Sequence, residues 1–230
     1  MRKTILLTCA LMFILIPAMA CGIDLSRSAS HETELSPLPS PTPDGGPFGV
    51  DANINMSTID NFLGRPDVVY IDIRMFYDPA DFPAIGGEPN LTQTLPGFRI
   101  VPFPYMATIP EMPVEGGYVG DSLFTVEWGE YRNIISYSPN FAESKMILRD
   151  LFPQDEIIFL MCGGAGYSAN MRTLLVHMGW NEQKIYHVGG NWHYQGDRAI
   201  DLTIEGNREH IATWRANYAF IDFSRLTRLV

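Results

Sequence analysis

The stretch that decides the fold is Ile157–Ser168, with the sequence IIFLMCGGAGYS. Five apolar residues in a row, followed by a cysteine, predict a strand that is buried on both faces, as strands are in a parallel sheet. Apolar residues at helical spacing after Ser168 predict a helix that begins at this serine and ends near Gly179. Backbone N–H groups of such a glycine-rich loop form an anion site. The stretch therefore predicts a reactive thiol, Cys162, facing an anion-binding loop.

Other stretches predict the neighbours of this strand. Val68–Arg74 is a β-branched run that predicts a strand, and it ends in the charged residues Asp72 and Arg74. Lys184–Val188 predicts another strand, which is followed by a Gly-Gly pair. Helical spacing across Asn140–Leu151 predicts a helix with its first residue as N-cap. Because strands alternate with helices, the sequence predicts an α/β fold with a mostly parallel sheet.

The chain divides into an amino-terminal part without a core and a folded part. Pro, Ser and Thr dominate residues 21–49, a composition that predicts a semi-extended tether. The folded domain is expected over residues 50–230, where Asn53–Met56 predicts a first strand and a short helix follows. Residues 75–140 are irregular and rich in proline, which predicts a long insertion. Alternating apolar residues within 197–230 predict a C-terminal β extension.

The aromatic residues of the insertion have two interpretations. They either line a pocket over the cysteine or pack the insertion itself, and the sequence leaves both open. The residues concerned are Tyr105, Tyr118, Phe124, Trp128 and Tyr131.

Residues 1–20 have the pattern of an export signal. Arg2 and Lys3 give a positive start, an apolar run follows, and small residues precede a cleavage position. With Cys21 directly after the predicted cut, the segment resembles the lipobox of bacterial lipoproteins. That resemblance implies a lipidated Cys21 and a protein anchored outside the cytoplasm. Ordinary cleavage with release of a soluble secreted protein stays open as the alternative.

The charge balance argues against two classes of partner. The formal net charge of the chain is −10 over 230 residues. A chain this acidic is repelled by the phosphates of nucleic acids and by anionic lipid surfaces. No nucleic-acid partner is expected, and the membrane link is expected to be the lipid on Cys21 alone.

Three other catalytic motifs match the loop only in part. Gly164–Ala169 fits G-x-G-x-x-A, but the acidic residue that a dinucleotide site needs about twenty positions later is missing. A cysteine phosphatase needs an arginine six positions after its nucleophile, where Ser168 stands. Asn170 replaces the final glycine of a G-x-S-x-G elbow. The histidines, among them His187, lack metal-ligand spacing, so a surface or core role is expected for them, with no metal and no cofactor.

Four features in this order resemble the rhodanese-like domain, over roughly Asn53–Gly196. They are the opening strand–helix–strand with its Asp-Ile-Arg ending, the cysteine loop, the helix after it, and the closing strand with its Gly-Gly and Trp192. The resemblance implies a three-layer α/β/α fold around a mostly parallel sheet. It also implies a sulfurtransferase in which Cys162 takes a sulfane sulfur from a donor, holds it as a persulfide and passes it to a thiol or another nucleophilic acceptor.

The resemblance also implies a role for the residues around the thiol. Cys162 is the implied nucleophile and sulfur carrier, and Asp72 and Arg74 are implied to brace the loop or the sheet edge. Backbone N–H groups of the loop are implied to bind substrate and stabilise the persulfide charge. The implied loop residues are Gly163, Gly164, Ala165, Gly166, Tyr167 and Ser168.

The loop departs from the family in its charge. Many members that use thiosulfate carry arginine or lysine in the loop, whereas Cys162–Tyr167 has no basic side chain. The natural sulfur donor and acceptor therefore stay open. A non-enzymatic thiol redox sensor or interaction module on the same fold is the alternative function.

Overall fold

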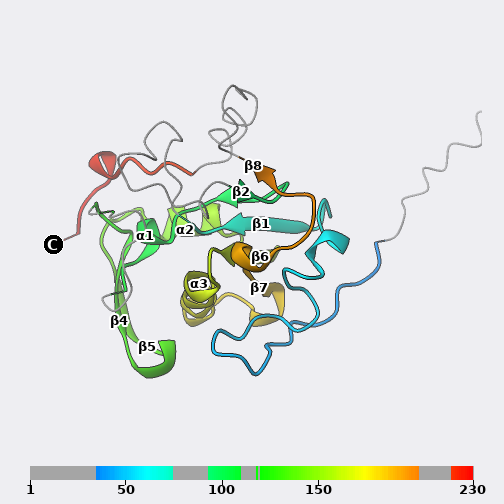
Figure 1. Cartoon of the computed structure of the whole chain (residues 1–230). Helices are drawn as coiled ribbons and strands as arrows, with labels where there is room; N and C mark the ends of the chain where they lie inside the picture. Colours follow the sequence, from blue (N-terminus) through cyan, green and yellow to red (C-terminus); the bar gives the residue numbers. More distant parts are fainter. Residues whose placement is uncertain (1–34, 75–92, 110–117, 119, 202–218, 230) are drawn as a thin grey trace, which may run out of the picture. The chain divides into compact units, whose positions relative to one another are not determined.

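The structure is a computed structural model that describes residues 35–74, 93–109, 118, 120–201 and 219–229 (Figure 1). The predicted signal, Cys21 and parts of the predicted insertion and extension lie outside these residues. The chain forms two compact units, Met1–Leu38 and Pro39–Val230, and all the helices and strands below belong to the second. None of the described helices is long and apolar enough to cross a lipid bilayer.

The main sheet of the second unit is parallel and has four strands. They are β1 (Val68–Asp72), β3 (Arg99–Ile100), β6 (Ile157–Cys162) and β7 (Ile185–Gly190). Their order is β3-β1-β6-β7, and each neighbouring pair is parallel. β6 therefore has a strand on each side, as its continuous apolar run predicts. The predicted α/β class with a mostly parallel sheet is confirmed.

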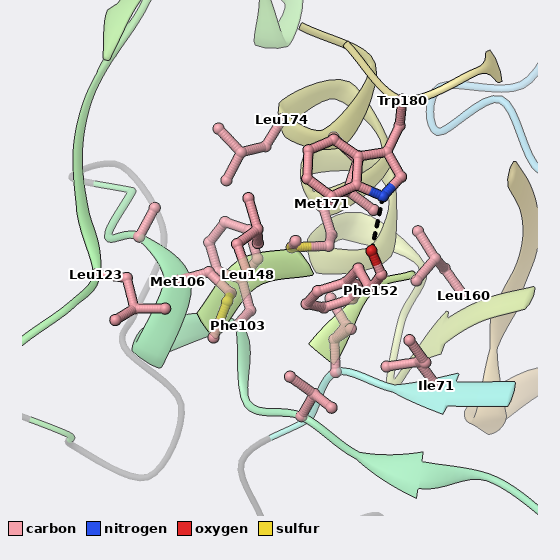
Figure 2. Close-up of a cluster of buried hydrophobic side chains, with 14 of the residues drawn as sticks. Ile71, Phe103, Met106, Leu123, Leu148, Phe152, Leu160, Met171, Leu174 and Trp180 are labelled. Carbon is pink, nitrogen blue, oxygen red and sulfur yellow. Dashed lines mark hydrogen bonds between the residues drawn. The ribbon is translucent and has the colours of Figure 1, made fainter. Parts of the chain in front are cut away.

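One face of this sheet packs against α-helices. The helices are α1 (Phe103–Met106), α2 (Ser144–Leu151) and α3 (Gly166–His177). All three contribute to one buried apolar cluster, which Ile71 and Leu160 join from the sheet. Figure 2 shows Trp180 over this cluster, where its Nε1 donates to the carbonyl of Phe152 at 2.8 Å. The cluster fixes α3 beside the end of β6 that carries Cys162 (Figure 1).

Successive side chains of a strand point to opposite faces of the sheet. On the face opposite the α-helices, these side chains are aromatic. Tyr70 lies next to Phe98 and Phe159, with ring centroids 5.3 and 5.6 Å away. Tyr70 Oη donates to the carbonyl of Phe62, which follows the 3-10 turn η1 (Ile59–Asn61). In the described part of the chain, a turn segment rather than an α-helix covers this face.

The prediction of a first strand at Asn53–Met56 is wrong, because these residues form bends and a turn. Asp51 Oδ1 accepts hydrogen bonds from the N–H groups of Asn53 and Ile54, at 2.9 and 2.7 Å. Asn55 Nδ2 donates to the carbonyl of Asp51 at 3.1 Å. Local side-chain bonds of this kind compete with the hydrogen bonds of a sheet, so the segment curls instead of pairing.

The helix predicted from Asn140 begins later, at Ser144. Glu143, the expected capping partner of Asn140, uses its carboxylate to accept the N–H and the hydroxyl of Thr227, at 3.0 and 2.8 Å. Ser144 Oγ accepts the N–H of Phe141 at 3.1 Å. A contact with the distant C-terminal segment has therefore replaced the expected local cap.

The insertion and the extension contribute two small antiparallel sheets. The elements are β2 (Gln93–Thr94), β4 (Phe124–Trp128), β5 (Ile134–Pro139) and β8 (Ile200–Asp201), with the 3-10 turns η5 (Glu130–Arg132) and η8 (Phe223–Arg225). β4 and β5 form a hairpin with η5 at its tip, and β2 pairs with β8. A strand of the extension thus pairs with a strand of the insertion.

The folded unit begins before residue 50, where the sequence places its start. Tyr186 Oη donates to the carbonyl of Pro39 at 2.7 Å, and the N–H of Thr42 donates to Asp51 Oδ2 at 2.6 Å. The N–H of Asp51 donates to the carbonyl of His187 at 2.8 Å. Residues 39–49 therefore pack along the outer edge of β7 instead of extending the tether.

Candidate active site

Cys162 is the last residue of β6, and its side chain is buried. Only 1% of the residue is exposed, and it belongs to the apolar cluster that the α-helices share. In the sheet it stands opposite Gly190 of β7. The thiol therefore lies where β6 passes into the loop before α3, in the strand–loop–helix order that the sequence predicts.

The side chain of Ser168 donates a hydrogen bond to this thiol. Its Oγ lies 3.3 Å from Cys162 Sγ, 3.1 Å from the carbonyl oxygen of Ala165 and 3.5 Å from that of Gly189. A hydroxyl has one proton to donate, so these three acceptors share it. This bond was not predicted from the sequence, although position 168 is the one from which a phosphatase arginine would return to the cysteine.

The prediction that Ser168 opens the helix is wrong, since α3 begins at Gly166. Ala165 stands at the N-cap position with φ 75° and ψ −18°, in the left-handed region. A non-glycine residue there is uncommon and is held by its surroundings. The early start places Ser168 inside the first turn of α3, from which its side chain reaches back to the thiol.

Gly190 allows β7 to approach the loop closely. A Cβ atom at Gly190 would lie 2.2 Å from the carbonyl oxygen of Gly163 and 2.7 Å from the amide nitrogen of Ala165. Contacts this short with backbone atoms cannot be relieved by a side-chain rotation. The loop backbone is therefore packed directly on the backbone of β7.

Trp192 covers the glycines of the loop from outside. It lies in the 3-10 turn η7 (Asn191–His193), and its N–H donates to the carbonyl of Gly163 at 3.1 Å. Cβ atoms at Gly163 and Gly164 would each come within 2.9 Å of its indole ring. The residue is 54% exposed, so the ring forms an outer wall of the loop. Trp192 was part of the predicted resemblance, but its contact with Gly163 and Gly164 was not predicted from the sequence.

Asp72 and Arg74 form a sealed ion pair at the end of β1. Both side chains are 0% exposed; Arg74 Nη2 lies 2.6 Å from Asp72 Oδ2, and Arg74 Nε lies 3.0 Å from Asp72 Oδ1. Arg74 Nη2 also donates to the carbonyl of Gln93 at 2.6 Å, and Thr94 Oγ1 donates to Asp72 Oδ2 at 3.1 Å. The pair thus ties β2 to the end of β1, beside the strand that carries Cys162.

Tyr167 links the loop to the insertion. Its ring lies 5.3 Å from that of Phe103 in α1, and Phe103 lies 6.5 Å from Trp128 in β4. Both partners come from residues 75–140, so part of the insertion does pack beside the loop.

The other aromatic residues of the insertion pack elsewhere. Tyr105 lies 5.4 Å from Tyr118, and Phe124 lies 6.2 Å from Tyr137. Tyr131, at the tip of the hairpin, is 96% exposed. Tyr105 also lies 5.7 Å from Phe223 of the extension, and Phe124 belongs to the apolar cluster that the α-helices share. Of the five, Trp128 is the one that contacts Phe103, the neighbour of Tyr167.

His187 is buried beside the loop, on β7. It is 2% exposed, and its Nδ1 lies 3.3 Å from the carbonyl oxygen of Gly49. Burial lowers the pKa of His187 from 6.5 to about 4, against the opposing effect of the carbonyl groups of Gly49 and Ala165. The imidazole is therefore neutral at neutral pH. The surface or core role that the sequence predicts for this histidine is resolved as a core role, and its partner Gly49 could not be predicted because it reaches His187 only in the folded chain.

The arrangement offers a nucleophile with one hydroxyl partner in an apolar setting. A thiolate attacks sulfur or carbon centres, and a hydroxyl donor stabilises the anion. Among the described residues, no three His, Cys, Asp or Glu side chains are grouped so that they could hold a metal ion. The chain matches none of the protein-family models, curated proteins or solved structures with which it was compared.

Proposed function

We propose that the protein is a rhodanese-like sulfurtransferase that carries sulfane sulfur on Cys162 as a persulfide. The observation that supports this most is the bond from Ser168 Oγ to Cys162 Sγ at the end of a central parallel strand. A rhodanese-like fold is part of the same proposal, supported by the parallel sheet and by α3 behind the cysteine loop. In the described residues the second outer layer consists of the turn segment around η1, where the three-layer α/β/α expectation places helices.

The proposed reaction is an exchange of sulfur between thiolates. The Cys162 thiolate attacks the outer sulfur of the donor, so that a new S–S bond forms and the S–S bond of the donor breaks. The electron pair of the broken bond leaves with the rest of the donor, as a thiolate or as sulfite. An acceptor thiolate then attacks the outer sulfur, and the bonding pair returns to Cys162. No net oxidation or reduction occurs.

The burial of Cys162 has a consequence for turnover. With 1% of the residue exposed, donor and acceptor reach the sulfur only after neighbouring side chains move. Trp192, which lies against Gly163 and Gly164 and is half-exposed, is the side chain best placed to move. Replacing it with alanine is expected to speed the reaction of Cys162 with thiol reagents.

Turnover tests the proposal directly. The full chain is incubated with an organic persulfide or thiosulfate as donor and a thiol as acceptor, and transferred sulfur is measured against time. We expect transfer by the wild type and none by Cys162→Ser, which retains the other two cysteines of the chain. Equal transfer by both proteins would contradict the proposal.

A non-enzymatic interaction module is the second candidate function. The burial of Cys162 within the apolar cluster favours it, because a cysteine can fill such a position purely by packing. Under this alternative, Cys162→Ala keeps the biological function and no persulfide forms.

The proposed site of action is the outer face of a bacterial membrane, through a lipid on Cys21. The export pattern of residues 1–20 supports this, and all of it lies outside the described residues. Cys21→Ser is expected to shift the protein from the membrane fraction to the soluble fraction. An unchanged distribution would contradict lipid anchoring.

A further inference from the structure

A small hollow lies beside the carboxyl end of α3, whereas the cysteine loop precedes the amino end of the same helix. The volume of the hollow is about 80 Å³. That is well above the roughly 10–15 Å³ that one water needs and well below the roughly 300–1,000 Å³ of sites for drug-sized ligands. The lining residues come from β5, α2 and the turn after α3: Tyr137, Lys145, Leu148, Arg149, Met178 and Trp180. The hollow therefore suits a small ligand or one end of a larger ligand.

Two of the lining side chains are cations, and none is an acid. Lys145 and Arg149 stand one turn apart on α2, and both are exposed. In the described part of the chain neither side chain makes a hydrogen bond or an ion pair. Two like charges at this spacing destabilise a helix slightly. The chain has 26 acidic and 16 basic residues, so a pair of cations without an acid runs against its overall balance.

Two common structural roles do not account for this pair. One is an ion pair along the helix, but the residues three and four positions away from Lys145 and Arg149 include no acid. The other is a cap on the carboxyl end of α3, which the backbone already caps. The N–H of Gly179 donates to the carbonyl of Val176, and the N–H of Trp180 donates to that of Leu175, both at 3.0 Å. Gly179 has φ 100°, as glycines in such caps do.

The other lining residues supply an apolar floor and a hydroxyl. Leu148 and Trp180 are 1% and 6% exposed, and the bond from Trp180 Nε1 to the Phe152 carbonyl fixes the indole ring (Figure 2). An apolar wall strengthens the attraction between opposite charges beside it. Tyr137 is half-buried, and its ring meets that of His177 edge-on at 5.7 Å. Among the described residues its hydroxyl has no hydrogen-bond partner, so the proton is left for a ligand.

We propose that this hollow binds a tetrahedral oxyanion, a phosphate or sulfate group, between Lys145 and Arg149. A guanidinium donates two parallel hydrogen bonds that match two oxygens of such a group, and an ammonium adds a compact positive charge. The Tyr137 hydroxyl donates to a further oxygen. The site is separate from Cys162 and does not depend on sulfur transfer.

The experiment is an NMR titration of the full chain with inorganic phosphate, at fixed pH and with chloride keeping the ionic strength constant. The assigned indole N–H signal of Trp180 reports on the hollow, because this ring lines it. We expect a shift that saturates in the wild type. Lys145→Gln and Arg149→Gln should each raise the dissociation constant about tenfold or more, since each removes one charged hydrogen bond. Both side chains are exposed, so the core stays intact.

The matched control is Arg225→Gln, which removes the same charge from an exposed arginine of η8 that does not line the hollow. Its dissociation constant should equal that of the wild type. No saturating shift in the wild type would overturn the proposal. An equal loss in Arg225→Gln would overturn it too, because the anion would then respond to the charge of the whole chain. Tighter binding of acetate than of phosphate would overturn the ligand class.

A second titration with glycerol phosphate separates the two sources of such a group. Tighter binding of the ester than of inorganic phosphate supports an end group of a larger ligand, and tighter binding of inorganic phosphate supports a free anion. Because no sulfur donor is present, both titrations are independent of whether the protein is a sulfurtransferase.

Discussion

Two polar clusters, one beside the Cys162 loop and one that includes Cys162, differ in how fully their hydrogen bonds are made. The ion-pair cluster consists of Asp72, Arg74, Thr94 and the carbonyl of Gln93, and its carboxylate and guanidinium are bonded several times over. The thiol cluster consists of Cys162, Ala165, Ser168 and His187, where one hydroxyl serves three acceptors and one ring nitrogen has no partner.

How completely a cluster is hydrogen-bonded determines whether it can rearrange. A buried network with its bonds complete has one arrangement and holds the backbone in place. A network with fewer donors than acceptors has several arrangements of similar energy, which a proton or a ligand can shift. The ion-pair cluster is therefore a brace, and the thiol cluster is where chemistry and regulation are expected.

Breaking the brace is expected to have the largest effect on stability. Arg74→Ala leaves the Asp72 carboxylate buried without its charge partner, and it should lower the free energy of unfolding by about 3–5 kcal/mol. Denaturant unfolding measures this loss. The double variant Asp72→Leu with Arg74→Met removes both charges and should cost less than Arg74→Ala alone. A single-variant loss below about 1 kcal/mol would show that the pair is not sealed.

The thiol cluster should show its effect as a pH dependence of stability. Burial lowers the pKa of His187 from 6.5 to about 4. Between these values the unfolded histidine binds a proton that the folded one does not, so the free energy of unfolding falls as the pH drops through this window. The loss amounts to at most about 3 kcal/mol.

The matched control for this pH dependence is His187→Gln. Carboxylates also titrate in this range, so the informative quantity is the wild-type loss between pH 6.5 and 4 minus the loss of the variant. A positive difference is expected from unfolding curves at a series of pH values. Identical pH profiles would mean that His187 is not buried in its neutral form.

The contact between β7 and the loop can be tested with a single methyl group. Gly190→Ala forces the Gly163 carbonyl or β7 to move, and it should destabilise the fold by about 1–3 kcal/mol. Gly45→Ala is the control, because a Cβ there meets nothing within 4 Å. Equal thermal stability of the two variants would contradict the close approach.

Removal of one hydroxyl from each cluster should give two unequal losses of stability, the smaller one in the thiol cluster. Thr94→Val removes a bond to the Asp72 carboxylate, which is expected to cost about 1.5–3 kcal/mol. Ser168→Ala removes a shared neutral bond and should cost about 1 kcal/mol or less. Only Ser168→Ala should change the reactivity of the thiol. Equal losses of stability in Thr94→Val and Ser168→Ala, with no change in the reactivity of Cys162, would contradict the proposed difference between the clusters.

The sequence predicts the central part of the fold because its signals there are continuous. Ile157–Cys162 has no polar residue to interrupt the run, and Met171, Leu174 and Leu175 repeat at helical spacing. Such patterns arise because a whole face of a strand or helix is buried. They can be recognised without knowing which element packs against that face. The predicted strand at Asn53–Met56 does not form, because the Asp51 carboxylate accepts the N–H groups of Asn53 and Ile54.

The site was predictable only where its residues are near in sequence. Cys162 and its loop follow from one stretch, and the Asp72–Arg74 pair from the end of another. The bond from Ser168 depends on the start of α3 at Gly166, which in turn depends on the unusual φ of Ala165. His187 depends on the packing of residues 48 and 49, more than a hundred positions away, for which no local pattern exists.

The most direct test of the central claim is the mass of the Cys162 peptide after brief exposure of the full chain to a sulfane sulfur donor, with thiols protected from reduction. If Cys162 carries sulfur as a persulfide, this peptide gains the mass of one sulfur atom, and a thiol acceptor removes it again. A Cys162 peptide that stays unmodified, while the wild type and Cys162→Ser gain equal mass elsewhere, would contradict the account.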